Sequence, residues 1–330
     1  MKAVVITRPG GVEVLELREV PTPQPAAGEV LVRVMASALN RADILQREGR
    51  YPAPPGAPAD IPGIEFAGEV AALGAEAATW RVGQRVFGIT GGGGHAEYLV
   101  AHEHTLAEVP ANLTWTEAAA VPEAFLTAQD ALWKQASLQP AERVLINAVG
   151  SGVGLAAVQL VRARNALPYG TARNPEKISR AREYGLEDGV TLRDSLDPLP
   201  ARVAEWTSGR GFDVVLDLVG GAYVAASVSA LALKGRLLLV GTLAGSSAQL
   251  DLRAVLSKRL RLIGTVLRAR PLEEKIAATR AFAAEVVPLL AKGTLRAVVD
   301  GEFPLAEIRA AHQRMESNET FGKVVIRVGG

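Results

Sequence analysis

Residues 146–154, INAVGSGVG, place three glycines and a serine between two apolar runs. A turn of this kind at the start of a helix can bind a phosphate, because backbone N–H groups point at the ligand and small residues let it approach. The spacing departs from G-x-G-x-x-G, since the last interval holds one residue where that motif has two. Counted in threes, the pattern is Ala148-x-x-Ser151-x-x-Gly154. A tight turn that binds no ligand is the alternative interpretation.

The turn predicts five residues in contact with a dinucleotide pyrophosphate: Gly150, Ser151, Gly152, Val153 and Gly154. The segment 169–177, YGTARNPEK, indicates which dinucleotide. An NAD site places Asp or Glu about 20 residues after the turn, whereas this segment offers Thr171, Arg173 and Lys177. A hydroxyl and two cations suit a 2′-phosphate, so we expect NADPH rather than NADH. The alternative is that both cations are solvated surface residues.

The elements around these residues predict an α/β chain. The first 110 residues hold short β-rich runs separated by Gly and Pro, one helix near 39–47 and a proline-rich loop at 48–63. Strands and helices alternate from about residue 125, with strands at 143–148, 166–171, 212–220 and 235–243, and helices at 153–164, from 174 and at 222–233. This alternation predicts a doubly wound parallel sheet of the Rossmann type.

After this region a helix is predicted over 271–292 and another near 304–317, with β-rich runs between and after them. The return to β structure indicates that the last segment rejoins the first domain. We therefore expect a mainly β catalytic domain at 1–123, a nucleotide-binding domain at 124–264 and a returning segment at 265–330.

Composition excludes several functions. The 330 residues are 48% hydrophobic and 22% charged, and 36 basic residues balance 35 acidic ones, so no global charge draws the chain to nucleic acid or membrane. Without cysteine there is no thiolate chemistry and no Cys-containing metal site. The four histidines are expected to be exposed or hydrogen-bonded and to hold no metal: His95, His102, His104 and His312. With no signal peptide or spanning segment, we expect a cytoplasmic protein.

This order of elements resembles the medium-chain dehydrogenase/reductase superfamily. The likeness is strongest to its zinc-free NADPH:quinone oxidoreductases, among them zeta-crystallin and, most of all, the p53-inducible branch. The segments that carry it are ALNRADILQREGRYPAPPG (38–56), GGGGHAEY (91–98), AAAVPEAFLTA (118–128), SGVGLAAVQL (151–160) and FGKVVIRV (321–328). The resemblance implies a Rossmann domain that binds NADPH and a GroES-like, mainly β catalytic domain.

Zinc alcohol dehydrogenases of this superfamily hold their metal with a Cys and with the His of a Pro-Gly-His-Glu stretch. The corresponding residues here are Pro62-Gly63-Ile64-Glu65. The resemblance therefore implies no metal, and hydride transfer from NADPH to an acceptor that is already electron-poor. Such acceptors are quinones and α,β-unsaturated carbonyls.

The resemblance also implies three catalytic-site residues: Asn40, Asp43 and Tyr51. Tyr51 would hydrogen-bond the carbonyl oxygen, Asn40 would hold the cofactor or polarise the acceptor, and Asp43 would stand behind Asn40. Two alternatives remain, because Asn40 can simply cap the helix that follows it and Tyr51 can simply anchor the proline loop. The sequence leaves open whether that loop moves as a lid or forms a fixed wall.

Further cofactor contacts implied by the resemblance are Thr127, Val219, Gly241, Thr242, Leu243 and Leu267. Two positions depart from the family pattern. Asn165 replaces a usual glycine, which Asn tolerates in a left-handed conformation. Leu192 stands where relatives often have a Tyr or His against the adenosine phosphate, which weakens the case for strong adenine-side binding.

Alternative functions are an NADPH-dependent 2-alkenal or enoyl reductase and a non-catalytic, crystallin-like NADPH-binding protein. A basic cluster lacks interleaved aromatic residues and is therefore not expected to bind nucleic acid: Arg253, Lys258, Arg259, Arg261, Arg268 and Arg270. By analogy with relatives we expect a homodimer, or a homotetramer, formed through the edge of the Rossmann sheet near 235–245 and 261–267.

Overall fold

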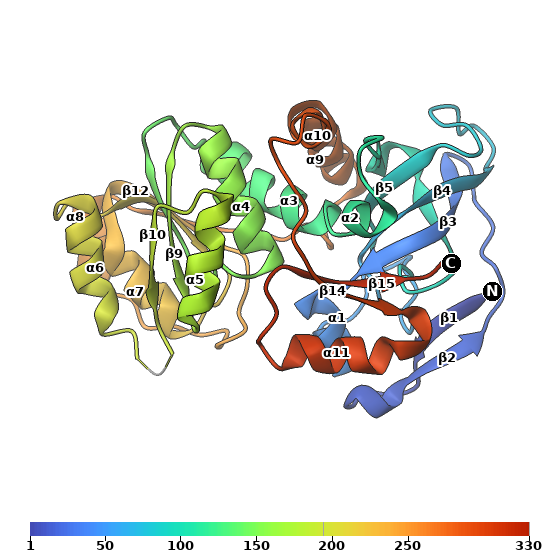
Figure 1. Cartoon of the computed structure of the whole chain (residues 1–330), viewed down its shortest axis with the longest axis horizontal. Coiled ribbons are helices and arrows are strands. Elements are labelled where there is room, and N and C mark those ends of the chain that lie inside the picture. Colours follow the sequence, from blue (N-terminus) through green and yellow to red (C-terminus); the bar gives the residue numbers. More distant parts are fainter. Residues whose placement is uncertain (194, 330) are drawn as a thin grey trace. The chain divides into compact units, whose positions relative to one another are not determined.

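A computed structural model describes residues 1–193 and 195–329. The chain forms two compact units (Figure 1). Unit 1 comprises Met1–Leu126 and Leu267–Gly330, and unit 2 comprises Thr127–Val266. The chain passes from one unit to the other within helix α3 (Pro122–Gln129) and just after strand β13 (Arg261–Gly264).

Unit 1 is mainly β. Its strands are β1 (Lys2–Ile6), β2 (Leu15–Glu19), β3 (Glu29–Ala38), β4 (Glu65–Leu73), β5 (Arg85–Ile89), β6 (Tyr98–His102), β7 (Leu106–Glu108), β14 (Val299–Pro304) and β15 (Lys323–Arg327). Its helices are α1 (Arg41–Arg47), α2 (Trp115–Ala119), α9 (Leu272–Glu285), α10 (Val287–Ala291) and α11 (Ile308–Glu316), with short turns η1 (Val12–Val14), η2 (Glu103–Thr105) and η5 (Leu305–Glu307). One sheet has the order β14-β15-β3-β4-β5-β7, with β6 also paired to β3, and β1 pairs with β2.

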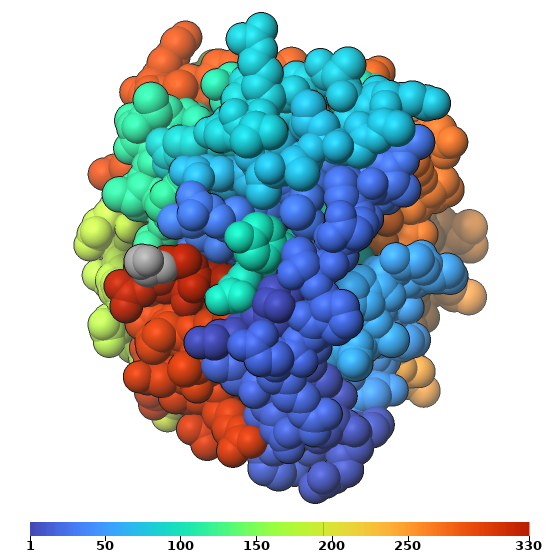
Figure 2. Space-filling view, turned by 90° about the vertical axis from the view of Figure 1, so that its right-hand side faces the viewer, coloured from blue at the N-terminus to red at the C-terminus, as the bar shows by residue number. Residues whose placement is uncertain are grey.

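The C-terminal segment is part of the core of unit 1. Strand β15 pairs antiparallel with β3, and α11 contributes Met315 to an apolar cluster with Val4, Leu15 and Ile326. Figure 2 shows the blue N-terminal segment and the red C-terminal segment side by side on one face of this unit. Strands from both ends of the sequence therefore build one hydrophobic core.

Unit 2 has the predicted Rossmann fold. Its elements are η3 (Asp130–Gln135), β8 (Arg143–Ile146), α4 (Gly152–Ala163), β9 (Leu167–Ala172), α5 (Pro175–Ala181), η4 (Arg182–Tyr184), β10 (Asp188–Thr191), α6 (Pro198–Thr207), β11 (Phe212–Asp217), α7 (Ala222–Ala230), β12 (Leu231–Leu239), α8 (Leu252–Lys258) and β13. The six strands are parallel in the order β10-β9-β8-β11-β12-β13. The order reverses between β8 and β11, which is where such sheets bind ligands.

Helices cover the sheet of unit 2 on both faces (Figure 1). α4 and α5 pack on β8, β9 and β10, while α6, α7 and α8 form a second group in contact with β10, β11 and β12. Asn165, after α4, has a φ of 56°, so the predicted left-handed conformation is confirmed.

Two predicted helices differ from the structure. The helix expected over 271–292 is divided at Val286 into α9 and α10, because Pro288 has no N–H to donate to the preceding turn. The helix expected over 222–233 ends at Ala230, and Leu231 already pairs with Phe212 in the sheet. In both cases the predicted apolar pattern was correct and the boundary was wrong.

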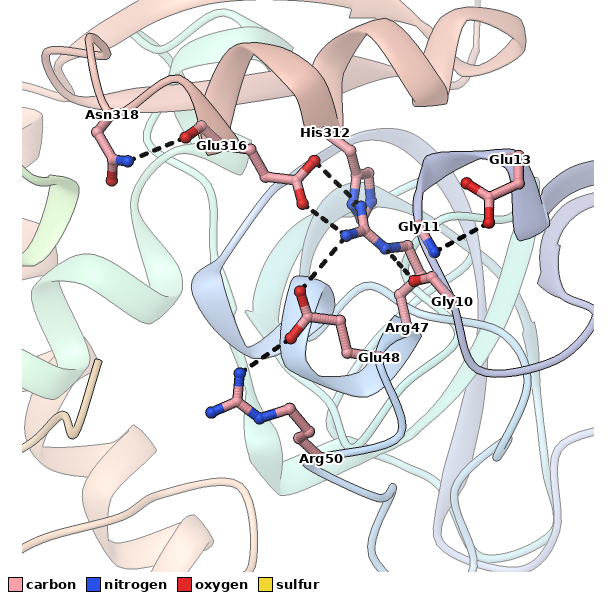
Figure 3. Close-up of polar contacts among 9 residues, drawn as sticks. All are labelled: Gly10, Gly11, Glu13, Arg47, Glu48, Arg50, His312, Glu316 and Asn318. Atoms are coloured by element: carbon pink, nitrogen blue, oxygen red, sulfur yellow. Dashed lines mark hydrogen bonds and ion pairs between the residues drawn. The ribbon is translucent and has the colours of Figure 1, made fainter. Parts of the chain in front are cut away.

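A buried guanidinium joins α1 to α11 (Figure 3). Arg47 is only 2% exposed and donates to both carboxylate oxygens of Glu316, at 2.6 Å and 3.3 Å. Its Nε donates to the Gly10 carbonyl at 3.1 Å, and its Nη1 donates to Nδ1 of His312 at 3.3 Å. Because a guanidinium group can only donate hydrogen bonds, Nδ1 of His312 must be the acceptor, and the neutral ring carries its proton on Nε2.

Two histidines are buried and incompletely hydrogen-bonded. His95 and His312 are both 0% exposed. Within the described part of the chain, His312 Nε2 and both ring nitrogens of His95 have no hydrogen-bond partner. The expectation of exposed or hydrogen-bonded histidines is therefore wrong at His95, whereas His312 is hydrogen-bonded through Nδ1 alone.

The surroundings of both rings favour their neutral forms. Burial, with His95 and Arg47 nearby, holds the pKa of His312 well below its usual range. Burial also lowers the pKa of His95, although the Asp43 carboxylate and the Ala38 carbonyl oppose this. Both rings are neutral in the folded protein near neutral pH.

We expect the free energy of unfolding to fall as the pH drops below about 6.5, the ordinary His pKa. Both pKa values are lowered in the fold, so unfolding takes up protons, and this part of the stability is lost on acidification. Urea titrations at about pH 7.5 and about pH 5.5 measure the loss, and His312→Gln should reduce it. His104→Gln, at a partly exposed histidine, serves as the control. Equal losses in wild type and His312→Gln would contradict the assignment.

Candidate functional site

The glycine turn after β8 begins α4. Ser151 is the N-cap, and its Oγ accepts the Gly154 N–H at 3.1 Å. Ala148 has a φ of 58°, which turns the chain at the end of the strand. A Cβ on Gly154 would lie 2.6 Å from the Ala148 carbonyl oxygen, so no larger residue fits there. Each residue of the A-x-x-S-x-x-G pattern thus has a part in forming the turn.

The turn is built to receive an anion. The N–H groups of Gly152 and Val153 belong to the first turn of α4, where no intrahelical acceptor exists. That first turn contains no acidic residue. A Cβ on Gly150 would lie 2.9 Å from Cδ of Lys177, so the lysine stem crosses the turn. The helix dipole and the lysine charge both favour a phosphate at this position.

The residues at the end of β9 differ in accessibility. Arg173 is exposed, as a phosphate ligand must be. Thr171 is only 1% exposed, and its hydroxyl donates to Asn147 Oδ1 at 3.2 Å and accepts the Ala148 N–H at 3.4 Å. Its hydroxyl therefore holds β9 to the turn and does not face a ligand, contrary to the role expected for it. Leu192 is also 1% exposed and packs in the hydrophobic core of unit 2.

Two loops lie against each other at the carboxyl edge of the same sheet. Ala244 donates its N–H to the Val219 carbonyl at 2.8 Å, and a Cβ on Gly241 would lie 2.5 Å from the Leu218 carbonyl oxygen. Thr242 and Leu243 are exposed beside them. Because the strands are parallel, these loops and the glycine turn share one edge of the sheet. Thr127, in α3, is buried and begins unit 2.

Two residues near this edge were not predicted. Asp217, the last residue of β11, is 0% exposed, and its Oδ2 has no partner within the described residues. Burial raises the pKa of this carboxyl group, and hydrogen bonds from the Val219 and Gly220 N–H groups lower it. Burial also raises the pKa of the Tyr223 hydroxyl, while the nearby charge of Arg173 lowers it. An acid inside the apolar run FDVVLDLVG was the available sequence signal for Asp217.

In unit 1, Asn40 is part of a buried network. Its Nδ2 donates to Glu65 Oε1 at 2.8 Å and to the Ala38 carbonyl at 3.3 Å, and its Oδ1 accepts from Lys323 Nζ at 2.6 Å. Both N–H bonds of the amide are therefore in use, so Asn40 has no donor left for a substrate carbonyl. The amide oxygen keeps one lone pair, which can accept a hydrogen bond.

The pair at the centre of this network is fully buried. Lys323 Nζ lies 2.5 Å from Glu65 Oε1 and also donates to the Leu39 carbonyl. The other Glu65 oxygen accepts the Glu123 N–H at 2.8 Å. Burial raises the pKa of Glu65, and the Lys323 ammonium opposes that shift. Removing one partner of such a pair costs about 3–5 kcal/mol, because the other charge stays buried.

Asp43 and Asn40 have different structural roles at the start of α1. Asn40 is the N-cap of α1, as the alternative interpretation holds. Asp43 is 0% exposed, and its two oxygens accept the N–H groups of Asn40, at 2.8 Å, and of Gly63, at 2.9 Å. Asp43 therefore fixes the start of α1 and the end of the proline loop from behind Asn40, where it was expected, and with both oxygens bound to backbone N–H groups it is a positioning residue that does not touch a substrate.

Tyr51 lies near the start of the proline loop and is half-buried. The guanidinium of Arg268 lies over its ring, 5.0 Å from the ring centroid. Burial raises the pKa of the Tyr51 hydroxyl, and the Arg268 charge opposes this. Leu267 immediately precedes Arg268 and is the first residue of the C-terminal part of unit 1. Asn40, Tyr51 and Leu267 thus belong to unit 1, and the glycine turn belongs to unit 2.

Comparison with known proteins identifies the family. Residues 26–111 match the alcohol dehydrogenase GroES-like domain, and residues 194–326 match the zinc-binding dehydrogenase family. A quinone oxidoreductase of Pseudomonas aeruginosa is 35% identical over 322 residues, which cover 96% of both chains. The chain belongs to the quinone oxidoreductase family of the medium-chain dehydrogenases/reductases.

Two solved members of this wider family are similar throughout. The Escherichia coli quinone oxidoreductase in complex with NADPH is 27% identical, with a TM-score of 0.89, and covers 99% of this chain and 100% of its own. A mycobacterial protein in complex with NADPH is 28% identical, with a TM-score of 0.90 and the same coverage. The combination of a GroES-like domain and a Rossmann domain is thereby confirmed.

The position that holds a zinc-binding His in zinc alcohol dehydrogenases is Ile64, which is 5% exposed in this oxidoreductase. No group of three or more His, Asp or Glu side chains in residues 1–193 and 195–329 could hold a metal ion. Among the helices of the same residues, none has the length and hydropathy of a membrane span.

Proposed function

We propose that this chain is an NADPH-dependent quinone oxidoreductase that transfers hydride without a metal to quinones or related electron-poor carbonyls. The observation that carries the proposal is the serine-capped glycine turn, with the stem of Lys177 across it and Arg173 exposed beside it. A 2′-phosphate needs cations and no carboxylate at this position. The relatives named as quinone oxidoreductases, and the two structures solved with NADPH, support the same function.

Each nucleotide-binding residue has a distinct contribution. The N–H groups at the start of α4 would hold the pyrophosphate, while Arg173 and Lys177 would hold the 2′-phosphate. Val219, Gly241, Thr242 and Leu243 would form the wall of the site at the edge of the sheet. Tyr223, whose pKa is lowered by the nearby charge of Arg173, would lie at the same adenosine end of the site. NADPH supplies the hydride when bound.

In the catalytic domain we assign two roles. Asn40 would accept a hydrogen bond from the carboxamide N–H of the nicotinamide, since its amide oxygen can accept a second hydrogen bond beside that from Lys323. Tyr51 would donate its hydroxyl proton to the acceptor oxygen, where negative charge develops as hydride arrives. A quinone then gains one hydride from the bound NADPH and one proton from Tyr51 to give the hydroquinone, and water returns a proton to Tyr51.

Arg173→Ala should weaken NADPH binding by at least about tenfold and leave NADH binding nearly unchanged, because only NADPH carries the 2′-phosphate. Fluorescence titration with each nucleotide measures the two dissociation constants. Arg210→Ala is the matched control, since Arg210 is exposed just before β11, at the opposite edge of the sheet. Equal weakening of both nucleotides by Arg173→Ala would refute the 2′-phosphate assignment.

Tyr51→Phe should lower kcat for quinones by about a hundredfold and change the KM for NADPH little, because it removes only the proton donor. NADPH consumption measured with quinones, 2-alkenals and enoyl thioesters tests the activity and the acceptor class together. Wild-type turnover of quinones identifies them as acceptors, and faster turnover of alkenals or thioesters favours the enoyl reductase alternative. Unchanged kcat in Tyr51→Phe would remove the donor role.

We also propose a homodimer formed through β13, the edge strand of the six-stranded sheet. An edge strand leaves one row of N–H and C=O groups unpaired. Exposed apolar side chains gather in the sequence around it: Leu243, Leu252, Leu256 and Val266. Leu252 and Leu256 are four residues apart on α8 and so share one face of that helix. A second copy of the chain would pair with β13 and cover these residues.

Light scattering after gel filtration should give twice the chain mass of 34.7 kDa for the wild type. Leu256→Glu should give the mass of one chain, since Leu256 is 77% exposed and a charge there disrupts only an interface. Val82→Glu, at an exposed apolar residue of unit 1, should keep the wild-type mass. A single-chain mass for the wild type would rule out the dimer.

A further inference from the structure

Arg268, the second residue of the C-terminal part of unit 1, is buried with 4% exposure. Its Nε and Nη2 donate to the Gly91 carbonyl at 2.9 Å and 2.7 Å, and Nη2 also donates to Gln46 Oε1 at 2.6 Å. Its Nη1 lies 3.4 Å from the Tyr51 carbonyl oxygen, and its guanidinium covers the Tyr51 ring. One side chain thus contacts α1, the glycine loop at 91–94 and Tyr51 near the start of the proline loop.

Contacts with α1, the glycine loop and β1 hold the proline loop in place. Gln46 accepts from Arg268 and donates through Nε2 to the Ala59 carbonyl at 3.0 Å. A Cβ on Gly91 would lie 2.7 Å from Cβ of Ala57, so the glycine loop lies directly against the proline loop. The Ile6 N–H donates to the Asp60 carbonyl at 2.7 Å. The loop is therefore bound near both ends and in its middle.

The acceptors of Arg268 are all neutral. Among residues 1–193 and 195–329, no carboxylate forms an ion pair with it. The charge of Asp43 raises the pKa of Arg268, but both Asp43 oxygens accept hydrogen bonds from backbone N–H groups. Lys275 on α9 adds a second positive charge nearby. Burial raises the pKa of the Tyr51 hydroxyl, the positive charge of Arg268 lowers it, and the negative charge of Glu123 raises it.

We propose that Arg268 is a positioning residue that fixes the ring of Tyr51 and stabilises the phenolate formed when Tyr51 gives up its proton. This inference rests on the proposed role of Tyr51. As hydride reaches the quinone, the acceptor oxygen takes the hydroxyl proton of Tyr51, and the O–H bond of the tyrosine breaks. The phenolate left behind lies beside a guanidinium whose charge no carboxylate neutralises, and water then returns the proton.

The pH dependence of kcat tests the proposal. Tyr51 must be protonated to act, so kcat should fall at alkaline pH as Tyr51 loses its proton. In Arg268→Gln we expect kcat to fall about tenfold and this alkaline limb to move to higher pH, because the charge that favours the phenolate is gone. The KM for NADPH should stay near the wild-type value. A residue that only supports the fold would lower kcat without moving the limb.

Arg268→Lys keeps the proposal testable if Arg268→Gln does not fold. Lysine retains the charge and loses the planar fork, so the limb should remain near its wild-type pH while kcat falls about tenfold. Wild-type kcat in Arg268→Lys, or an unmoved limb in Arg268→Gln, would overturn the proposal. Arg280→Gln, at an exposed arginine of α9, is the matched control and should behave as wild type.

The Tyr51→Phe variant distinguishes failure of the proposed donor role of Tyr51 from failure of the proposed role of Arg268. If its profile lacks the alkaline limb and the Arg268 variants leave that limb unmoved, Tyr51 remains the donor and only the role of Arg268 fails. If Tyr51→Phe keeps the wild-type kcat and limb, the proposed donor itself is wrong, whatever the Arg268 variants do.

Discussion

The buried ion pair between Glu65 and Lys323 is the interaction on which unit 1 depends. It joins β4 to β15, which are separated by most of the sequence, and both side chains are nearly or fully inaccessible to solvent. Removing two charges from water is costly, and the cost is offset only when each has its partner and further hydrogen bonds. Asn40 and the Glu123 N–H supply those bonds. The pair therefore fixes the Asn40 amide at the same time as it holds the C-terminal strand.

Two other buried cations also contact α1 or the residue preceding it, but only Arg47 has a carboxylate partner, whereas Arg268 has neutral acceptors. Lys323 contacts Asn40, Arg268 contacts Gln46, and Arg47 itself forms the fork with Glu316. In each case one partner belongs to the segment after residue 266. A helix of seven residues is too short to be stable alone, so its position must come from tertiary contacts. The returning segment thus determines where Asn40 and the start of the proline loop lie.

The serine-capped turn and the parallel sheet of unit 2 could be predicted from the sequence because their determinants are local. The cap at Ser151, the left-handed Asn165 and the alternation of strands and helices all depend on residues near one another in the chain. The substrate half depends on contacts between distant residues, which no local pattern shows. For this reason no local pattern indicated that both N–H bonds of the Asn40 amide are used or that His95 and His312 are buried. The inward-facing hydroxyl of Thr171 in unit 2 was missed for the same reason, because its partner Asn147 is 24 residues away in the sequence. Strand β10 was missed because Asp188 and Gly189 are poor strand formers, placed there by pairing with β9.

The state of Asn40 restricts the chemistry that this family member can perform. With both amide N–H bonds used, Asn40 cannot polarise an acceptor carbonyl, and the position of the zinc-site histidine is occupied by the buried, apolar Ile64. Under the proposed mechanism, stabilisation of the developing oxyanion then falls to the Tyr51 hydroxyl and the charge of Arg268 behind it. One neutral donor lowers a barrier much less than a bound cation does. An acceptor must therefore be electron-poor before it binds, which favours quinones over simple ketones.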